Sequence, residues 1–133
     1  MRYRMHGMVP IIEALGGGMS YSEKTIAGMF HNRAERYQYE TCVRYKDQGA
    51  YTAISWNEMA RRVVSLGLGL ISLGVKKGDI VAIFSDNRWE WLAADLAVLS
   101  IGAADAPIYA TNSGEEAAYI INDSGAKVCF VSG

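Results

Sequence analysis

Few side chains in this sequence stand at a spacing that catalysis or phosphate binding requires. A phosphate-binding loop needs glycines and a lysine between a strand and a helix, so that backbone N–H groups surround the oxyanion. Gly67 and Gly69 fall inside a predicted helix, where close packing of helices explains them better. The three glycines at 16–18 follow no predicted strand. Neither a P-loop nor a dinucleotide-binding fingerprint is therefore predicted.

Nucleophilic catalysis is no better supported. No G-x-S-x-G elbow occurs, and Cys129 lies in a predicted buried strand, where an inert core thiol is expected. His31 is one of two histidines, and the sequence places no carboxylate or nucleophile to orient it. We expect His31 to be a half-exposed structural residue. The two histidines and the two cysteines, Cys42 and Cys129, stand in no zinc-ligand spacing.

Three aspartates, Asp79, Asp86 and Asp95, fall at predicted loop or helix positions without an evident partner. Asp86 is the most suggestive, because open α/β sheets bind ligands at the carboxyl ends of their strands. Capping or turn formation beside Asn87 is the default role of Asp86. The residues taken alone thus indicate no reaction centre.

The composition places limits on the class of protein. The chain has 133 residues, of which half are hydrophobic, and a formal net charge of −1. This composition predicts a globular domain, and the lack of excess basic charge argues against a nucleic-acid partner. No apolar run is long enough to span a bilayer and no signal peptide is recognised, so a cytoplasmic location with both thiols free is expected. Residues 1–24, rich in methionine and glycine, predict a flexible N-terminal arm.

Hydrophobic periodicity predicts the elements that would position any site. Helices are expected over 25–37, 56–73, 88–101 and 113–123, and strands over 41–47, 51–55, 79–85, 104–109 and 127–131. The first two strands are separated by a glycine-containing link, which suggests a hairpin. Capping pairs are predicted at Ser55 with Glu58, Asn87 with Glu90, and Ser113 with Glu116.

The order of these elements predicts an α/β fold, namely a partial doubly wound parallel sheet of βαβ units preceded by a helix and a β-hairpin. The helix at 88–101 is apolar nearly all round, which implies burial on more than one side. Trp89 and Trp91 are expected to pack against a part of the protein outside these residues, rather than to face lipid. We therefore expect the chain to be the front part of a longer protein.

Residues 25–133 resemble the N-terminal region of the AMP-forming acyl-CoA synthetases, the acyl-adenylate-forming family. The motifs that carry the resemblance are S-W-N-E at 55–58, L-G-V-K-K-G-D-I-V-A-I at 73–83, N-R-W-E-W at 87–91, A-D-L-A at 94–97 and G-A at 102–103. The segment P-I-Y-A-T-N-S at 107–113, together with N-R-W-E-W, is most similar to the long-chain fatty acyl branch. The order and spacing of these pieces carry the resemblance.

The resemblance implies a large two-domain ligase that joins a fatty acid to ATP and then to CoA, through an acyl-adenylate, with Mg²⁺ around the phosphates. In the family, the phosphate loop, the nucleotide contacts and the catalytic lysine lie beyond residue 133. We therefore expect no catalytic or metal-binding residue and no bound cofactor in this piece, and expect it to be inactive alone. Tyr109, Ala110 and Thr111 match a segment that borders the CoA entrance, so they are candidate wall residues.

Two alternatives remain open. One is a standalone flavodoxin-like or receiver-like binding module, which would need an acidic cluster or a phosphate loop at the strand ends. The other is an adenylating ligase for a different carboxylic acid. The partners expected are the rest of the parent polypeptide and, because a cut sheet exposes an edge, a second copy of the chain. Peripheral contact of the parent with a membrane is also open.

Overall fold

Nine segments of regular structure follow one another along residues 23–132, the part of the chain that this computed structural model describes. In chain order they are α2 (Ile26–Tyr37), β1 (Thr41–Asp47), β2 (Ala50–Ser55), α3 (Trp56–Ser72), β3 (Ile80–Ser85), α4 (Trp89–Ser100), β4 (Ala104–Tyr109), α5 (Gly114–Ser124) and β5 (Val128–Val131). The predicted helices and strands are confirmed, with ends that differ by at most one residue. The arm predicted over 1–24 lies almost wholly outside the described residues.

The main sheet is parallel, with the strand order β4-β3-β5. Val81 of β3 is paired with Asp105 of β4 on one side and with Val128 of β5 on the other. Parallel neighbours need crossover connections, and α4 and α5 provide them. The first crossover runs from β3 to β4, and the second runs in the opposite direction, from β4 past β3 to β5, so right-handed connections place α4 and α5 on opposite faces. The predicted doubly wound α/β architecture is thereby confirmed.

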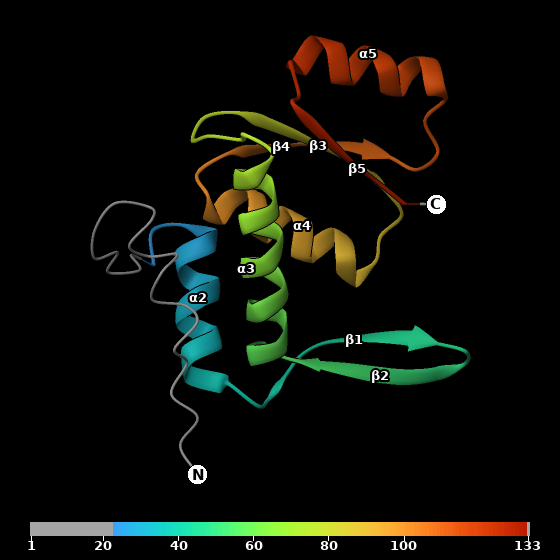
Figure 1. Ribbon diagram of the computed structural model, residues 1–133. Coiled ribbons are helices and arrows are strands. Elements are labelled where there is room, and N and C mark those ends of the chain that lie inside the picture. Colours follow the sequence, from blue (N-terminus) through green and yellow to red (C-terminus); the bar gives the residue numbers. More distant parts are fainter. Residues whose placement is uncertain (1–22, 133) are drawn as a thin grey trace.

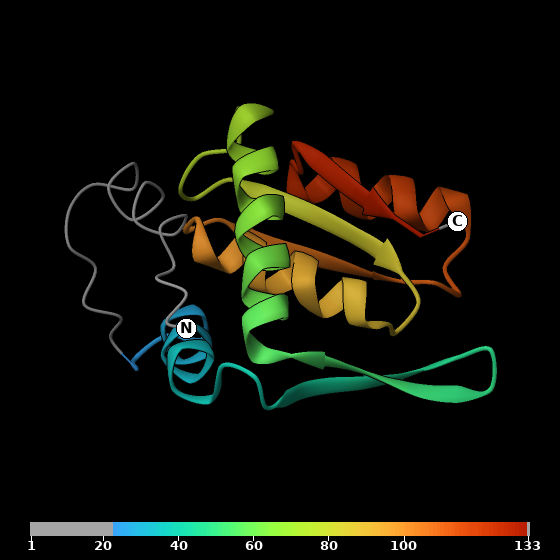
Figure 2. The ribbon, with the colours of Figure 1, turned by 60° about the horizontal axis from the view of Figure 1, so that its bottom comes forward.

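The helices form unequal layers on the two faces of this sheet. Helices α2, α3 and α4 lie together on one face, whereas α5 covers the other, as Figures 1 and 2 show. The helices α3 and α4 approach each other closely where Gly67 faces Ala97 and Ile101. A Cβ on Gly67 of α3 would lie 3.3 Å from Cγ2 of Ile101. The packing role predicted for Gly67 is confirmed, while Gly69 has open space around it.

The central strand β3 and the helix α4 are both deeply buried. Val81, Ala82 and Ile83 of β3 are at most 1% exposed, because sheet neighbours flank them and helices cover both faces. Full burial of one such aliphatic side chain contributes about 1.5–3 kcal/mol. In α4, the consecutive residues Leu96, Ala97 and Val98 are at most 4% exposed. Because consecutive residues point about 100° apart around a helix, this confirms that α4 is covered on more than one side. Among residues 23–132, none of the helices combines the length and the apolar character needed to cross a membrane.

The antiparallel hairpin β1-β2 projects from the helical layer (Figure 2). Asp47 is paired with Ala50, so the connection has two residues, Gln48 and Gly49. Both have positive φ, at 46° and 89°, which is the backbone of a type I′ turn and favours glycine. The predicted hairpin is thus confirmed, with its second strand starting one residue earlier.

One of the three predicted capping pairs is complete, at Ser113, whereas the pair at Ser55 has only its serine half because the Glu58 carboxylate binds Arg62. The Ser55 hydroxyl accepts the backbone N–H of Glu58 at 3.2 Å, and Ser113 forms a full capping box with Glu116. The predicted Asn87–Glu90 pair is wrong: Arg88 is the N-cap of α4 and makes no side-chain capping bond. Its guanidinium instead binds the carboxylate of Glu90, which removes that carboxylate from any capping role.

Candidate functional site

The carboxyl ends of the three parallel strands meet at one edge of the sheet, which is where open α/β sheets bind ligands. Ser85 at the end of β3 is paired in register with Tyr109 at the end of β4. Ser132 follows β5, and its backbone N–H donates to the carbonyl of Phe84 at 3.1 Å. Its hydroxyl accepts the backbone N–H of Asp86 at 3.4 Å. Three segments distant in sequence thereby form one candidate site.

Tyr109, Ala110 and Thr111 lie at this edge as an exposed turn between β4 and α5. The Tyr109 side chain is 82% exposed, and its carbonyl accepts the backbone N–H of Asn112 at 2.9 Å. The capping box of α5 fixes the chain immediately after this turn. All three residues are accessible to a ligand. Their assignment to the wall of a CoA entrance stays a prediction.

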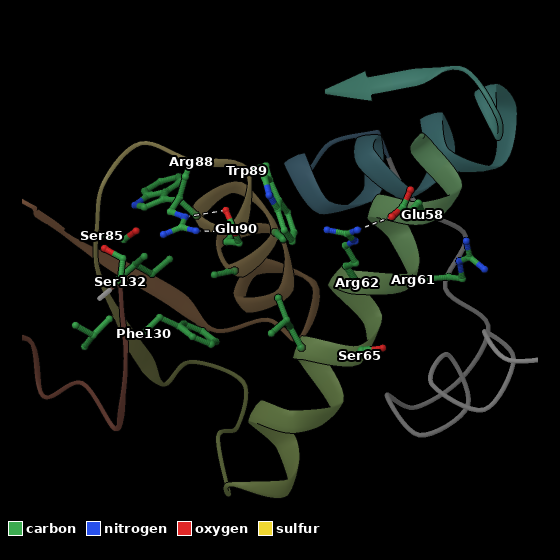
Figure 3. A pocket seen from close by; sticks show the side chains of 16 residues that line it. Glu58, Arg61, Arg62, Ser65, Ser85, Arg88, Trp89, Glu90, Phe130 and Ser132 are labelled. Carbon is green, nitrogen blue, oxygen red and sulfur yellow. Dashed lines mark hydrogen bonds and ion pairs between the residues drawn. The ribbon is translucent and has the colours of Figure 1, made fainter. Parts of the chain in front are cut away.

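A cavity of about 640 Å³ opens beside the ends of β3 and β5, between α3 and the first turns of α4. Its lining combines aromatic and aliphatic side chains with three arginines, two glutamates and three serines (Figure 3). The lining residues are Glu58, Arg61, Arg62, Ser65, Leu66, Ile83, Ser85, Arg88, Trp89, Glu90, Trp91, Ala93, Ala94, Phe130, Val131 and Ser132. Apolar carbon thus makes most of its floor, and charged groups surround it. We call it the edge cavity.

Two of the three arginines of the edge cavity form ion pairs with glutamates. Arg62 forms an ion pair with Glu58 one helical turn away, and its guanidinium lies 4.1 Å from the ring centre of Trp89. Arg88 binds both carboxylate oxygens of Glu90 at 2.8 Å. This pairing lowers the pKa of Glu90 and raises that of Arg88. These contacts fix the two side chains seen around Trp89 in Figure 3.

A second cavity, of about 760 Å³, lies between the hairpin strand β1 and the loop that leads from β3 into α4. Trp89 lies between the two cavities and contributes to both linings. Its indole faces Tyr45 of β1, with ring centres 6.1 Å apart. Trp89 therefore connects the hairpin to α3, since Arg62 stacks on the same ring.

Several side chains weighed from the sequence have different surroundings from those expected. His31 is 5% exposed rather than half-exposed, and its Nε2 lies 3.0 Å from the Ser100 hydroxyl. Burial lowers the pKa of His31, as expected for a structural imidazole between helices. Burial likewise raises the pKa values of the Cys42 and Cys129 thiols, both of which are free. The inert role predicted for Cys129 is in line with this raised pKa.

The statement that the aspartates lack partners is wrong for two of them. Asp79 binds Lys127 Nζ at 2.8 Å and accepts the backbone N–H of Lys76 at 2.7 Å, which lowers its pKa. Asp95 of α4 shares a hydrogen bond with Asp105 of β4. Partial burial, followed by the neighbouring Asp105, raises the pKa of Asp95 to about 6. Neither pairing was evident from sequence, because both partners are distant along the chain.

Sequence reasoning also missed the arginines of the edge cavity. Glu58 and Arg62 stand four residues apart on a predicted helix, and that spacing was an available signal for an ion pair. The stacking of Arg62 on Trp89 had no such signal, because it depends on how α3 and α4 cross. Asp86 is exposed in the β3–α4 loop. Among residues 23–132, no three His, Cys, Asp or Glu side chains come together as a metal-binding group.

The strand order β4-β3-β5 and the helices on both faces define a doubly wound parallel α/β fold. A solved structure with a similar fold is the N-terminal subdomain of Klebsiella oxytoca NpsA, which superposes with a TM-score of 0.71 at 24% identity. It matches 81% of this chain but only 27% of that chain. At this identity the likeness shows the fold alone.

The sequence comparisons identify the family. Residues 30–133 match the family model of the AMP-binding enzymes, so the chain belongs to the AMP-binding enzyme family. A relative from Mycobacterium bovis, long-chain-fatty-acid–CoA ligase FadD15, is 45% identical over 82 residues. A Mycobacterium tuberculosis relative, 3-[(3aS,4S,7aS)-7a-methyl-1,5-dioxo-octahydro-1H-inden-4-yl]propanoyl:CoA ligase, is 40% identical over 76 residues. These matches cover 62% and 57% of this chain, but only 14% and 15% of the two ligases.

Proposed function

We propose that the chain is the first part of the AMP-binding domain of a long-chain fatty acyl-CoA ligase. In the proposed reaction, a fatty acid carboxylate attacks the α-phosphate of ATP, and pyrophosphate leaves. The CoA thiol then attacks the acyl carbonyl, and AMP leaves with the bond electrons. The observation that carries the proposal is the 45% identity to the Mycobacterium bovis long-chain fatty acyl ligase over 82 residues.

We propose that this piece of the ligase binds neither ATP nor Mg²⁺ by itself. Phosphate binding would need a glycine- and lysine-containing loop, and Mg²⁺ would need grouped carboxylates. Residues 23–132 bring together no acidic group of that kind. We propose that ATP and Mg²⁺ bind elsewhere in the parent polypeptide. Tyr109, Ala110 and Thr111 would contribute only an accessible wall for CoA.

If ATP and Mg²⁺ bind elsewhere in the parent polypeptide, the isolated chain should be inactive. Purified chain with palmitate, ATP, Mg²⁺ and CoA should release no pyrophosphate above a blank reaction. Millimolar ATP with Mg²⁺ should also leave its melting temperature unchanged, since a ligand at 100 times its Kd would stabilise the fold by about 2.7 kcal/mol. Pyrophosphate release that depends on the chain would refute the proposal that ATP and Mg²⁺ bind elsewhere in the parent polypeptide.

The assignment of this chain to a long-chain fatty acyl-CoA ligase is tested by the coding sequence and by a panel of carboxylic acid substrates. The reading frame after Gly133 should encode, within a few dozen residues, a Gly/Ser/Thr-rich loop that ends in Lys-Gly. The encoded ligase should then favour palmitate over acetate, benzoate and polycyclic acids in kcat/KM. A preference for another acid would support the alternative ligase, for which the indenyl-propanoyl:CoA ligase is the specific precedent among the relatives.

We also propose that the isolated chain self-associates, and that the parent acts in the cytoplasm. Both β4 and β5 are edge strands of the three-stranded sheet, and Val131 of β5 is 66% exposed. Open edges and exposed apolar groups favour association between copies. Sedimentation velocity at tens of micromolar should show species larger than 14.6 kDa. A single monomer boundary at that concentration would contradict self-association.

A further inference from the structure

The two outer strands of the parallel sheet differ in how well their free edges are protected. Among residues 23–132, β4 and β5 are each paired with β3 on one side only. Ala104 at the start of β4 donates its backbone N–H to the carbonyl of Asp79, on the β3 side. Because the backbone groups of a strand alternate in direction, the backbone N positions of Asp105, Pro107 and Tyr109 point away from β3. Proline has no N–H, so the free edge of β4 lacks its central donor and also carries an acidic residue, both of which discourage strand addition.

The free edge of β5 has neither protection. The backbone N–H of Ser132 donates to the carbonyl of Phe84 in β3 at 3.1 Å. The same alternation therefore turns the N–H and C=O groups of Cys129 and Val131 away from β3. The strand Val128–Val131 contains no charged residue, no proline and no glycine, and the Val131 side chain is 66% exposed. An uncharged edge rich in β-branched and aromatic residues is a template for pairing with another strand.

We propose that two copies of the 133-residue chain pair through their β5 edges, as antiparallel neighbours about a twofold axis. The pairing rests on the self-association proposed above and names the surface that carries it. In an antiparallel ladder, residues whose backbone groups point outward exchange both N–H···O bonds with outward-pointing residues of the other strand. The register that satisfies all of these groups places Cys129 opposite Val131 of the second copy, and Phe130 opposite Phe130 of the second copy. The two parallel sheets thereby become one continuous sheet.

A second copy matches the β5 edge in both charge and symmetry. Since β5 is uncharged, the pairing opposes no like charges, and the two Phe130 side chains face each other directly across the axis. A contact that uses the same edge of both copies is complete after two chains have joined. The β4 edge, with Pro107 at its centre, does not extend the sheet further. The expected product is therefore a dimer rather than a filament.

The test measures the oligomeric state of the full 133-residue chain by sedimentation velocity over a range of micromolar concentrations. Val131→Lys places a charge on the β5 edge, and Val131→Pro removes an outward N–H without removing a hydrogen bond to β3. Tyr109→Lys is the matched control, because Tyr109 is also an outward-pointing residue near the end of an outer strand and is 82% exposed. Both positions are exposed, so the urea midpoints of the two lysine variants should stay close to that of the unmodified chain.

We expect the unmodified chain to show a concentration-dependent species of twice the 14.6 kDa monomer mass. Val131→Lys and Val131→Pro should each raise the Kd of the dimer about tenfold or more, while Tyr109→Lys changes it less than about twofold. Amide hydrogen exchange of the unmodified chain provides a second measurement that needs no variant. The amides of Cys129 and Val131 should exchange more slowly as the concentration rises, whereas those of Asp105 and Tyr109 should not change.

Three results would overturn the β5 pairing. The first is association that both Val131 variants leave unchanged, or that Tyr109→Lys weakens equally, which would move the contact to another surface. The second is concentration-dependent protection of the Asp105 and Tyr109 amides in place of those of Cys129 and Val131. The third is a chain that stays monomeric at every concentration, which would refute self-association together with the pairing. The ligase assignment does not depend on these outcomes, because the panel of carboxylic acid substrates tests it separately.

Discussion

The shared hydrogen bond between Asp95 and Asp105 makes a sharp prediction about stability and pH. Partial burial and the second carboxyl raise the pKa of Asp95 from 3.8 to about 6 in the folded chain. A shift of this size corresponds to about 3 kcal/mol, and partial exposure to solvent reduces the net effect to about 1–2 kcal/mol. Because the folded state favours the protonated acid, its contribution is fully present below about pH 4 and is lost as the pH rises through about 6.

The perturbation that tests this is Asp95→Asn, which keeps the shape and removes the ionisation. Urea unfolding, followed by tryptophan fluorescence, should be measured from pH 4 to pH 7.5. The free energy of unfolding of the variant minus that of the unmodified chain should be near zero at pH 4. At pH 7.5 the variant should be more stable by about 1–2 kcal/mol. Asp123→Asn on α5 is the control, since it removes an exposed aspartate of the same helix-borne type.

A difference in the free energy of unfolding between Asp95→Asn and the unmodified chain that does not change with pH would contradict the raised pKa of Asp95. It is also refuted if the variant is the less stable protein at pH 7.5. Asp105→Asn should reproduce part of the effect, because Asp105 is the second cause, after burial, of the raised pKa of Asp95. An effect at Asp95 alone would instead indicate simple burial of one carboxyl.

Three further changes test the packing and the caps by urea or thermal unfolding. Ser113→Ala removes the capping box of α5 and should destabilise the chain by about 1 kcal/mol, whereas Ser113→Asp should retain most of the stability. Gly69→Ala should stabilise α3 by about 0.5–1 kcal/mol, and Gly67→Ala should gain less or lose stability, since its Cβ meets Ile101; equal gains would show that the helices do not pack this closely. Ile83→Ala, at 1% exposure in β3, should cost about 2–5 kcal/mol, and a loss below 1 kcal/mol would contradict the described core.

Much of the fold was predictable because local and periodic signals agree in this chain. The apolar run around Ile83 and the nearly all-apolar helix α4 indicated burial on several sides before any contact was known. The cap at Ser113 was also legible, because both partners of a capping box lie within one turn. The false cap at Asn87 shows the limit of that logic. A neighbouring arginine can take the glutamate that the motif assigns to the backbone.

The site was less predictable because its contacts depend on how elements cross. The stacking of Arg62 on Trp89 requires the angle between α3 and α4. The pairing of Asp95 with Asp105 requires the register of β4 beneath α4, and the bond from Asp86 to Ser132 requires β5 beside β3. Only the motif resemblance indicated Tyr109–Thr111, and the structure adds that this turn is open to solvent.

The position of β3 between β4 and β5 has a consequence for how the protein is made. This strand is the first of the sheet to leave the ribosome, yet both of its hydrogen-bonding edges are filled by strands synthesised later. In the nascent chain, the apolar strand β3 therefore lacks one or both of its sheet neighbours until β5 emerges. Until then only the helical layer can cover it. Slow translation between residues 86 and 128 should favour capture by chaperones, whereas the hairpin and the first two helices can assemble early from nearby contacts.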